Sequence, residues 1–354
     1  MKFLVTGVAG FIGSHLVHRL CSEDHEVIGV DNINDYYDVN LKESRLKEFS
    51  SYKNFIFEKS DLSNYTETLK IFEKYRFNRV IHLAAQAGVR YSIENPGAYV
   101  DSNLKGFLSI LEGCRKFDVA HLVYASSSSV YGMNTKIPFS TRHSTDHPVA
   151  LYGASKKANE VMAHSYSSLY QIPSTGLRFF TVYGPKGRPD MALFKFTRAI
   201  LEDKEIEVFN EGNMTRDFTY IDDVIEAIVR VHEVIPQRNP SWSEEDLSSS
   251  SAPHKIYNVG NGSPVKLLDF IEEIENYLGK KAKRKLMPLQ QGDVINTHSD
   301  CEELFSNTGF KPRINIREGV KNFLDWYLEY YKIDLLSLIH ISEPTRLGMI
   351  SYAV

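Results

Sequence analysis

The stretch that decides the fold is Lys2-Phe3-Leu4-Val5-Thr6-Gly7-Val8-Ala9-Gly10-Phe11-Ile12-Gly13, near the start of the chain. Its apolar run suits a buried parallel strand, and residues 14–20 that follow the glycines have helical spacing. The glycines permit a tight turn, close approach of backbone N–H groups to a pyrophosphate, and close packing of the helix on the strand. Strand, glycines and helix in this order predict a dinucleotide-binding turn.

A second apolar strand, residues 26–30, ends at Asp31, near the ~20-residue offset at which an acidic side chain binds the ribose of a dinucleotide. A carboxylate there repels a 2′-phosphate, so the sequence favours NAD over NADP as cofactor. Further strands are expected at residues 55–58, 79–85 and 120–125, alternating with helices at about 64–75 and 98–117. This alternation predicts an α/β fold with a Rossmann-type, doubly wound parallel sheet.

In such a sheet the ligand crevice lies at the carboxyl ends of the strands. Asp31, Asp61, Ala84-Ala85 and Ser126-Ser127 all follow predicted strands, so one crevice should collect them. We expect residues 1–180 to form the cofactor domain, with later sheet elements from about 215–260. Residues 181–333 should form mainly a substrate lobe, with helices at 190–202, 222–234, 266–278 and 316–331.

The run Tyr152-Gly153-Ala154-Ser155-Lys156 is the strongest indication of chemistry. Because a helical pattern follows it, the four-residue spacing places the phenol and the ammonium on one face. A free tyrosine, with a pKa near ~10, is a poor base at neutral pH. A nearby cation favours the phenolate, and lowering the pKa by ~3 units needs ~4 kcal/mol. The pair predicts an acid/base catalyst for a sugar hydroxyl or carbonyl, unless it is merely a surface lysine beside a half-buried tyrosine.

Composition limits the choice of partners. The 354 residues fit one large α/β unit with a second lobe, and the net charge of −4 argues against nucleic acid or an anionic membrane as the main partner. Three scattered cysteines indicate reduced thiols in a cytoplasmic protein. The cysteines and histidines show no metal-ligand spacing, the chain opens on a strand rather than a signal peptide, and no apolar run reaches membrane length. We therefore expect no metal and no membrane association.

Two local features have structural interpretations. Asp222 and Asp223 precede an apolar-periodic run and are expected to cap its helix. The basic run Lys280–Lys285 is expected to be the solvated start of a strand rather than a nucleic-acid patch.

The glycine motif, Ser127, Tyr152 and Lys156 occur together with longer stretches at residues 31–38, 82–92, 179–185, 187–192 and 216–223. In this combination the chain resembles the extended short-chain dehydrogenase/reductases that act on nucleotide sugars, and more closely the UDP-glucuronate 4-epimerases. The resemblance covers about residues 1–333. One departure is Gly153, where the family has Ala; it costs ~1 kcal/mol and leaves the Tyr–Lys geometry intact.

The resemblance implies a cytoplasmic NAD-dependent isomerase of polysaccharide biosynthesis, a homodimer that pairs through helices near 98–117 and 152–170. It implies that Tyr152 removes the proton of the sugar 4-hydroxyl while nicotinamide takes the C4 hydride. Lys156 would bind the nicotinamide ribose and lower the pKa of Tyr152, and Ser127 would hydrogen-bond the same sugar oxygen. The 4-keto sugar then rotates and recovers the hydride on its other face. The implied cofactor contacts are Gly7, Gly10, Phe11, Ile12, Gly13, Asp31, Asn32, Asp61, Leu62, Leu83, Ala84, Ala85, Tyr152 and Lys156.

The resemblance also distinguishes reactions. Related dehydratases carry an Asp-Glu pair, and decarboxylases a Glu, where this chain has Ser128 and Ser129. The absence of an acid favours 4-epimerisation of UDP-glucuronate with its carboxylate retained.

A UDP-sugar acid brings a pyrophosphate and a carboxylate, so the substrate lobe must supply guanidinium groups. Arg216 is the candidate for the pyrophosphate, Arg188 for a reach across the substrate, and Arg90 for lining the sugar pocket. Each could instead form a surface or fold-supporting ion pair, and Arg178 is assigned to the fold. Thr181 and Asp293 resemble nucleotide- or sugar-contacting positions.

Three alternatives stay open. The chain could be a 4-epimerase of UDP-glucose or UDP-N-acetylglucosamine, a UDP-glucuronate decarboxylase, or a non-catalytic NAD-binding module. A binding module has no need of an activated phenol, which argues against it. Residues 334–354 are expected to be a non-native tail, because Ser337–Val354 resembles a translated sequencing adaptor; an apolar docking tail is the alternative.

Overall fold

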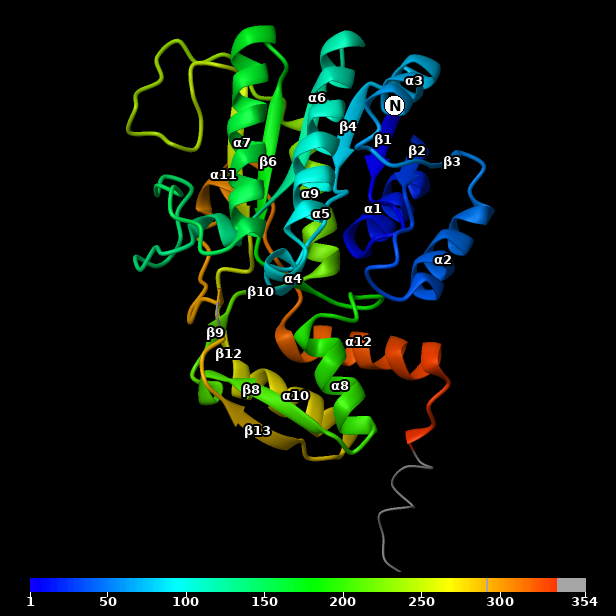
Figure 1. The fold of residues 1–354 in the computed structure, drawn as a ribbon, viewed down its shortest axis with the longest axis vertical. Helices are drawn as coiled ribbons and strands as arrows, with labels where there is room; N and C mark the ends of the chain where they lie inside the picture. Colours follow the sequence, from blue (N-terminus) through cyan, green and yellow to red (C-terminus); the bar gives the residue numbers. More distant parts are fainter. Residues whose placement is uncertain (291, 336–354) are drawn as a thin grey trace, which may run out of the picture.

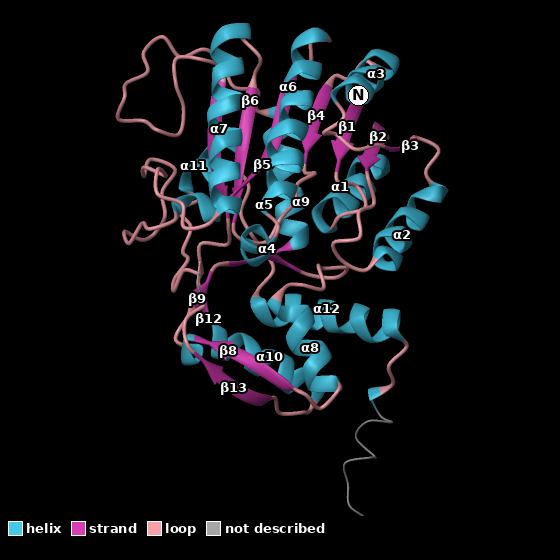
Figure 2. Ribbon diagram, in the orientation of Figure 1, coloured by secondary structure: helices cyan, strands magenta, loops and turns pink. Residues whose placement is uncertain are grey.

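The computed structural model of the protein describes residues 1–290 and 292–335, so most of the predicted tail, residues 336–354, lies outside it. The larger part of the molecule is a seven-stranded parallel sheet in the order β11-β6-β5-β4-β1-β2-β3 (Figures 1 and 2). Its strands are β1 Lys2–Thr6, β2 Glu26–Asp31, β3 Phe55–Lys59, β4 Arg79–His82, β5 His121–Ser127, β6 Ser174–Phe179 and β11 His254–Val259. The predicted doubly wound α/β fold is confirmed.

The strand order reverses between β1 and β4, and this switch point opens a crevice at the carboxyl ends of the two strands. Strand β4 ends at His82, three residues before the end of the predicted strand at residues 79–85. The reason is local, because the N–H groups of Leu83 and Ala84 both donate to the Thr6 hydroxyl of β1, at 3.1 Å each. The chain therefore leaves the sheet at the crevice.

Helices cover both faces of the sheet. On one face lie α3 Tyr65–Tyr75, α6 Gly106–Lys116 and α7 Leu151–Tyr170, and on the other lie α1 Phe11–Ser22 and α9 Ile221–Glu233 (Figure 1). Shorter helical segments of this part are α2 Val39–Glu48, η1 Phe49–Ser51, α4 Val89–Glu94, η3 Ser128–Tyr131 and α11 Glu302–Thr308. No helix in the described residues is both long and apolar enough to cross a membrane.

The predicted helix at residues 98–117 is not one regular α-helix. It consists of α5 Pro96–Tyr99, a π-helical segment η2 Val100–Lys105, and α6. Within η2 the buried Asn103 amide accepts a hydrogen bond from the Gln86 N–H (2.8 Å) and donates to the Gln86 carbonyl (3.0 Å). The segment thus holds the chain that follows β4.

The second lobe lies below the carboxyl ends of the sheet strands (Figure 1). Its helices are α8 Ala192–Leu201, η4 Asn210–Gly212, α10 Leu267–Leu278 and α12 Ile316–Tyr331. Its paired strands are β8 Glu205–Phe209 with β13 Lys283–Met287 and β9 Thr215–Arg216 with β12 Val265–Lys266, while β7 Thr181–Tyr183 with β10 Phe218–Tyr220 leads into it. The basic run 280–285 enters the exposed strand β13, as expected.

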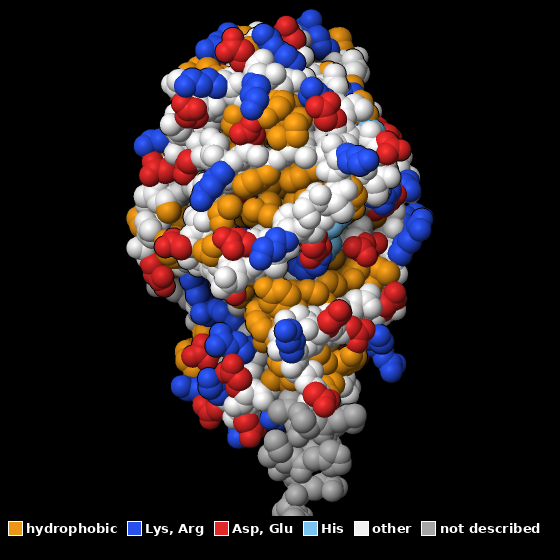
Figure 3. Space-filling model, turned by 90° about the vertical axis from the view of Figure 1, so that its right-hand side faces the viewer, with side chains coloured by type: hydrophobic (Ala, Val, Ile, Leu, Met, Phe, Trp, Pro, Cys, Tyr) orange, Lys and Arg blue, Asp and Glu red, His pale blue; other side chains and the backbone are white. Residues whose placement is uncertain are grey.

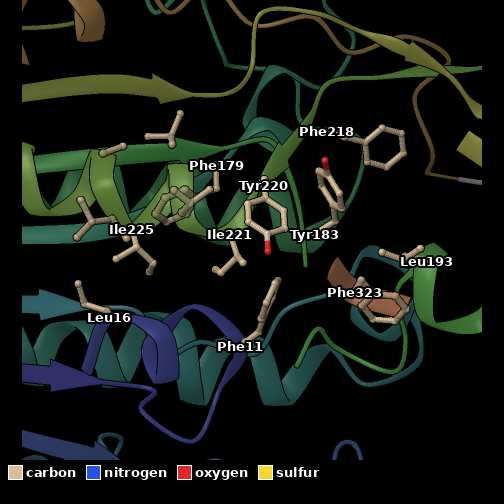
Figure 4. Packing of buried hydrophobic residues seen from close by; sticks show 14 of the residues in the cluster. Phe11, Leu16, Phe179, Tyr183, Leu193, Phe218, Tyr220, Ile221, Ile225 and Phe323 are labelled. Atoms are coloured by element: carbon tan, nitrogen blue, oxygen red, sulfur yellow. The ribbon is translucent and has the colours of Figure 1, made fainter. Parts of the chain in front are cut away.

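One buried apolar cluster joins the two parts. It extends from Phe3 and Val5 of β1 through Phe11 of α1 to Phe323 of α12, and Figure 4 shows Phe11 and Phe323 within it. From the side, the broad sheet-bearing part narrows to the lobe, with a band of apolar side chains where they meet (Figure 3). The crevice is therefore built on a continuous core.

The predicted capping role of Asp222 and Asp223 is wrong. Helix α9 begins at Ile221 with Tyr220 as its N-cap, so both carboxylates lie in the first turn. There they complement the positive end of the helix. Asp223 accepts the N–H groups of Arg313 (3.0 Å) and Ile314 (3.1 Å), and so ties the segment before α12 to α9.

Candidate active site

A cavity of about 460 Å³ runs along the carboxyl ends of the strands. All the predicted cofactor residues line it, as do the predicted catalytic Ser127, Tyr152 and Lys156. The lobe closes its other side with Thr181, Arg188, Arg216 and Asp293. The structure thus brings together in one crevice residues that lie up to 290 positions apart in the chain, from Gly7 to Thr297.

The glycine turn leaves backbone exposed to this cavity because side chains would not fit there. Gly7 has a φ of +76°, and a Cβ on it would lie 2.8 Å from the Ala84 nitrogen. A Cβ on Gly13 would lie 2.1 Å from the Gly7 carbonyl oxygen. The first turn of α1 has no side-chain cap among the described residues, which leaves its N–H groups for an anion. These features fit the pyrophosphate of a dinucleotide.

Asp31 lies at the end of β2 beside this turn. Its carboxylate accepts the Ala9 N–H at 3.0 Å and the Ile33 N–H at 2.8 Å. Burial raises the pKa of Asp31, although these bonds and the nearby Lys42 oppose the shift. The Asn32 amide donates to Asp61 at 3.0 Å, so this end of the cavity presents carboxylate oxygens suited to ribose hydroxyls.

Tyr152 and Lys156 occupy the first turns of α7 and face the end of β5. The Tyr152 ring lies against that of Tyr99, with centroids 6.1 Å apart, and Ser127 lines the same cavity and favours the Tyr152 phenolate. The Lys156 ammonium donates to the Ala125 carbonyl at 3.0 Å. Tyr152 and Lys156 therefore lie on one face of α7, as predicted, and this face is directed at the end of β5.

The expected lowering of the Tyr152 pKa by Lys156 is not what the structure shows. Burial raises the pKa of Tyr152, and the Ser127 hydroxyl and the Arg188 charge oppose this rise. Burial also lowers the pKa of Lys156, to about 8. Desolvation disfavours both charged forms. In this protein Ser127 and Arg188, rather than Lys156, are the groups that favour the Tyr152 phenolate.

The serine tract continues from β5 into η3. The Ser127 hydroxyl accepts the Ser129 N–H at 3.2 Å, and Ser128 and Ser129 are half-buried at the cavity wall. No carboxylate replaces them in this stretch of the sequence. The tract therefore presents uncharged hydroxyls to the cavity, as predicted.

Two arginines enter the cavity from the lobe, each held by an aspartate. Arg188 is bound side-on by Asp190, with Nε to Oδ1 at 3.0 Å and Nη2 to Oδ2 at 2.5 Å. Arg216 pairs with Asp293 at 2.9 Å and donates to the Ile295 carbonyl at 2.8 Å. Both guanidinium groups are thereby oriented and keep further N–H donors for an anion.

Arg90 needs a correction, because it does not line the cavity. It is exposed, donates to Gln290, and lies over the Phe209 ring at 4.8 Å. The argument from substrate charge placed it near the sugar, but its guanidinium donates to Gln290 instead. Arg178 pairs with buried Glu160, as its assignment to the fold predicted.

Comparison with known proteins places the chain. The model of the NAD dependent epimerase/dehydratase family matches residues 3–260. The chain belongs to this family. Protein CapI of Staphylococcus aureus is 58% identical over 334 residues, covering 94% of this chain and 100% of CapI. The probable UDP-glucuronate 4-epimerase of Rhizobium meliloti is 46% identical over 338 residues, covering 94% and 98%.

Solved epimerase structures agree with this placement. The crystal structure of UDP-glucuronic acid 4-epimerase from Bacillus cereus, in complex with UDP-glucuronic acid and NAD, matches with a TM-score of 0.82. It is 31% identical, and the match covers 94% of this chain and 100% of that one. A UDP-glucose 4-epimerase from Thermotoga maritima with UDP-glucose gives a TM-score of 0.78 at 27% identity, covering 94% and 100%.

This epimerase/dehydratase site contains residues that the sequence did not assign. Tyr36 lines the cavity and donates to Asp190 at 3.2 Å. It lies in residues 31–38, one of the stretches that carry the family resemblance, and this stretch could have indicated it. Lys42 lines the cavity from α2 and donates to the Asn34 side chain at 2.7 Å, and nothing in its sequence context distinguishes it. The other unassigned polar residues of the wall include Asn34, Tyr37, Gln86, Ser102 and Thr297. In residues 1–290 and 292–335 no cluster of three or more His, Cys, Asp or Glu side chains is arranged to hold a metal ion.

Proposed function

We propose that the protein is an NAD-dependent UDP-glucuronate 4-epimerase, which converts UDP-glucuronate to UDP-galacturonate through a transient 4-keto intermediate. The observation that carries the proposal is the meeting of Tyr152, Ser127 and an acid-free serine tract with two lobe arginines in one cavity. The similar proteins named UDP-glucuronate 4-epimerase, and the Bacillus cereus enzyme that binds UDP-glucuronic acid and NAD, support it. The UDP-glucose alternative has less support.

The cofactor domain, residues 1–180 with later sheet strands, would hold NAD through the glycine turn, Asp31 and Lys156. When bound, NAD supplies reversible hydride acceptance at C4. The protein's own part begins at Tyr152, whose phenolate takes the proton of the 4-hydroxyl and returns it after the sugar has turned. Ser127 favours the phenolate before substrate binds and would donate its one proton to the sugar oxygen in the complex, and the Arg188 charge favours the phenolate further.

The substrate lobe, residues 181–333, would hold the UDP-sugar. Arg216 binds the pyrophosphate, with Asp293 and Thr181 beside it. The 4-keto intermediate is a β-keto acid, so loss of carbon dioxide is the side reaction that the site must suppress. Ser128 and Ser129, with Arg188 nearby, would hold the carboxylate by uncharged donors, out of line with the carbonyl π system, at ~1–3 kcal/mol per charged hydrogen bond.

The test is turnover of UDP-glucuronate by purified protein, with the products separated by chromatography. We expect UDP-galacturonate and no stoichiometric carbon dioxide. A UDP-pentose with carbon dioxide would replace the epimerase by a decarboxylase. Conversion of UDP-glucose alone would indicate a neutral-sugar epimerase, and inactivity on every UDP-sugar beside tight NAD binding would indicate a binding module.

We also propose a cytoplasmic homodimer acting in polysaccharide biosynthesis. Exposed apolar side chains lie on the two helices expected at the interface, Leu108 on α6 and Val161 and Leu169 on α7. Replacing Val161 and Leu169 by serine should convert a dimer to a monomer in light scattering. A wild-type monomer at micromolar concentration would overturn this part.

A further inference from the structure

Three residues of α7, each one helical turn from the next, reach the last three residues of β5. Ser127 acts on the Tyr152 phenol at the cavity wall, Lys156 donates to the Ala125 carbonyl at 3.0 Å, and Glu160 accepts the Ser126 hydroxyl at 2.6 Å. The four-residue spacing places all three side chains on one stripe of the helix. The reaction described above uses the first two contacts and leaves Glu160 without a role.

Glu160 is buried with a partner that holds it from another strand. Its side chain is 5% exposed, and that of Arg178 in β6 is 3% exposed. The guanidinium binds both carboxylate oxygens, with Nε to Oε1 at 2.8 Å and Nη2 to Oε2 at 2.9 Å. Although burial favours the neutral acid, the Arg178 charge and hydrogen bonds hold the pKa of Glu160 below its ordinary value. The carboxylate is therefore a charged, immobile acceptor.

The ion pair of Glu160 and Arg178 also contacts the far end of the serine tract. The Arg178 guanidinium lies 4.9 Å from the ring centroid of Tyr131, the last residue of η3. The Tyr131 hydroxyl in turn donates to the Asn258 side chain of β11 at 2.6 Å. Glu160 and Arg178 thus contact both ends of the segment 126–131 that carries Ser127.

We propose that Glu160 is a positioning residue that sets the place of Ser127 against the Tyr152 phenol through the Ser126 hydroxyl. Ser126 and Ser127 are joined by a single planar peptide unit, so fixing one restricts the other. A carboxylate is required because it accepts from Arg178 and Ser126 together, whereas the NH₂ end of an amide cannot accept. This inference rests on the proposed function for its rate measurements.

The groups that act on the Tyr152 side chain come from three places: Ser127 of β5, Tyr99 of α5 and Arg188 of the lobe, while the Lys156 ammonium donates to the Ala125 carbonyl instead. Of these, Ser127 and Arg188 favour the phenolate. A misplaced Ser127 should therefore raise the pKa of Tyr152 while Arg188 is unchanged. The rate should then rise with pH later than in the wild type.

The experiment compares kcat and KM across pH for Ser126→Ala and Glu160→Gln. Each should lower kcat at pH 7 by ~10-fold, leave KM within ~3-fold, and move the rising limb of kcat up by about one pH unit. Because both act on one contact, the double variant should lose no more than the worse single variant. Ser126→Ala keeps the buried ion pair, so it remains informative if Glu160→Gln does not fold.

The matched control is Ser167→Ala, on the same helix. The Ser167 hydroxyl is fully buried and donates to the Ile172 carbonyl at 2.7 Å, far from the cavity. It should lower stability and leave the pH profile of kcat unchanged. A profile that shifts equally in Ser167→Ala, or an unshifted profile in Ser126→Ala, would overturn the proposal. A raised KM with unchanged kcat would mean that Ser126 contacts substrate directly, which also overturns it.

Failure of the proposed function is distinguishable. If wild-type protein turned over UDP-glucose but not UDP-glucuronate, the same variants would be measured with UDP-glucose. If it turned over neither, the pKa of Tyr152 would be measured directly from tyrosinate absorbance in an alkaline titration. Subtracting the curve of Tyr152→Phe from that of the wild type isolates the titration of Tyr152. The same difference in the Ser126→Ala background should titrate about one pH unit higher, and coincidence of the two curves would refute the positioning role.

Discussion

Replacing Tyr152 by phenylalanine separates catalysis from folding, because the ring keeps its packing and only the hydroxyl is lost. The ring lies 6.1 Å from that of Tyr99, at an interplanar angle of 71°, and this contact needs no hydroxyl. Ser127 acts on the phenol, and losing an interaction of hydrogen-bond strength costs at most ~0.5–1.5 kcal/mol of stability. Losing the acid/base group should lower kcat by ~10²–10⁴-fold, or ~3–5 kcal/mol of barrier.

The matched control is Tyr99→Phe, which removes the same atom from the neighbouring ring. The Tyr99 hydroxyl donates to the carbonyls of Ala87 (3.1 Å) and Gly88 (2.5 Å), so its loss should lower stability by at least as much. The kcat of Tyr99→Phe should stay within ~3-fold of wild type, because the Tyr99 hydroxyl binds backbone carbonyls and takes no part in the proton transfer. Urea unfolding and initial rates would be measured on both. A Tyr152→Phe enzyme within ten-fold of wild type, or one no slower than Tyr99→Phe, would refute the assignment of Tyr152 as the base.

Three further predictions concern charge. Burial lowers the pKa of Lys156 from 10.5 to about 8. Between these two pH values the unfolded chain binds more protons than the folded one, so the free energy of unfolding should rise with pH by up to ~3 kcal/mol. Urea unfolding of the Lys156→Met variant should lack that rise. The control variant Lys105→Met, at an exposed lysine, should keep it. Asp31→Ala should weaken NAD binding by ~10–100-fold in equilibrium dialysis, and preference for NADP by the wild type would contradict the role given to this carboxylate. Arg216→Met should weaken UDP binding in calorimetry by ~10–100-fold while NAD binding is kept; an unchanged UDP affinity would exclude Arg216 as the pyrophosphate ligand.

Much of the site could be predicted because its geometry is local. Gly7, Gly10 and Gly13 directly follow an apolar strand, and the backbone conformation of that turn depends only on residues close to it in the sequence. Tyr152 and Lys156 share a face because helical periodicity alone puts residues four apart together. The ends of parallel strands collect at one edge of a sheet, which brought Asp31 and the serines into one crevice without knowledge of any long-range contact.

The errors concern interactions between distant residues. Asp223 binds backbone 90 positions away at Arg313 rather than capping its own helix. The Arg90 side chain contacts Gln290, 200 positions away, and so does not reach the cavity. The sequence assigns no role to Tyr36 or Lys42, because only folding brings them to the cavity wall.

Sequence by itself determined the doubly wound sheet, the cofactor turn and the Tyr–Lys pair, because each depends on residues within one or two elements. Only the tertiary structure decided which arginines enter the cavity, how deeply the phenol is buried, and that Ser126 meets Glu160, 34 positions later. Burial is a property of everything packed around a group, and it raises the pKa of Tyr152 where sequence spacing predicted a lowering. Spacing along a helix fixes direction, whereas desolvation and partners are set by chain segments that meet only in the fold.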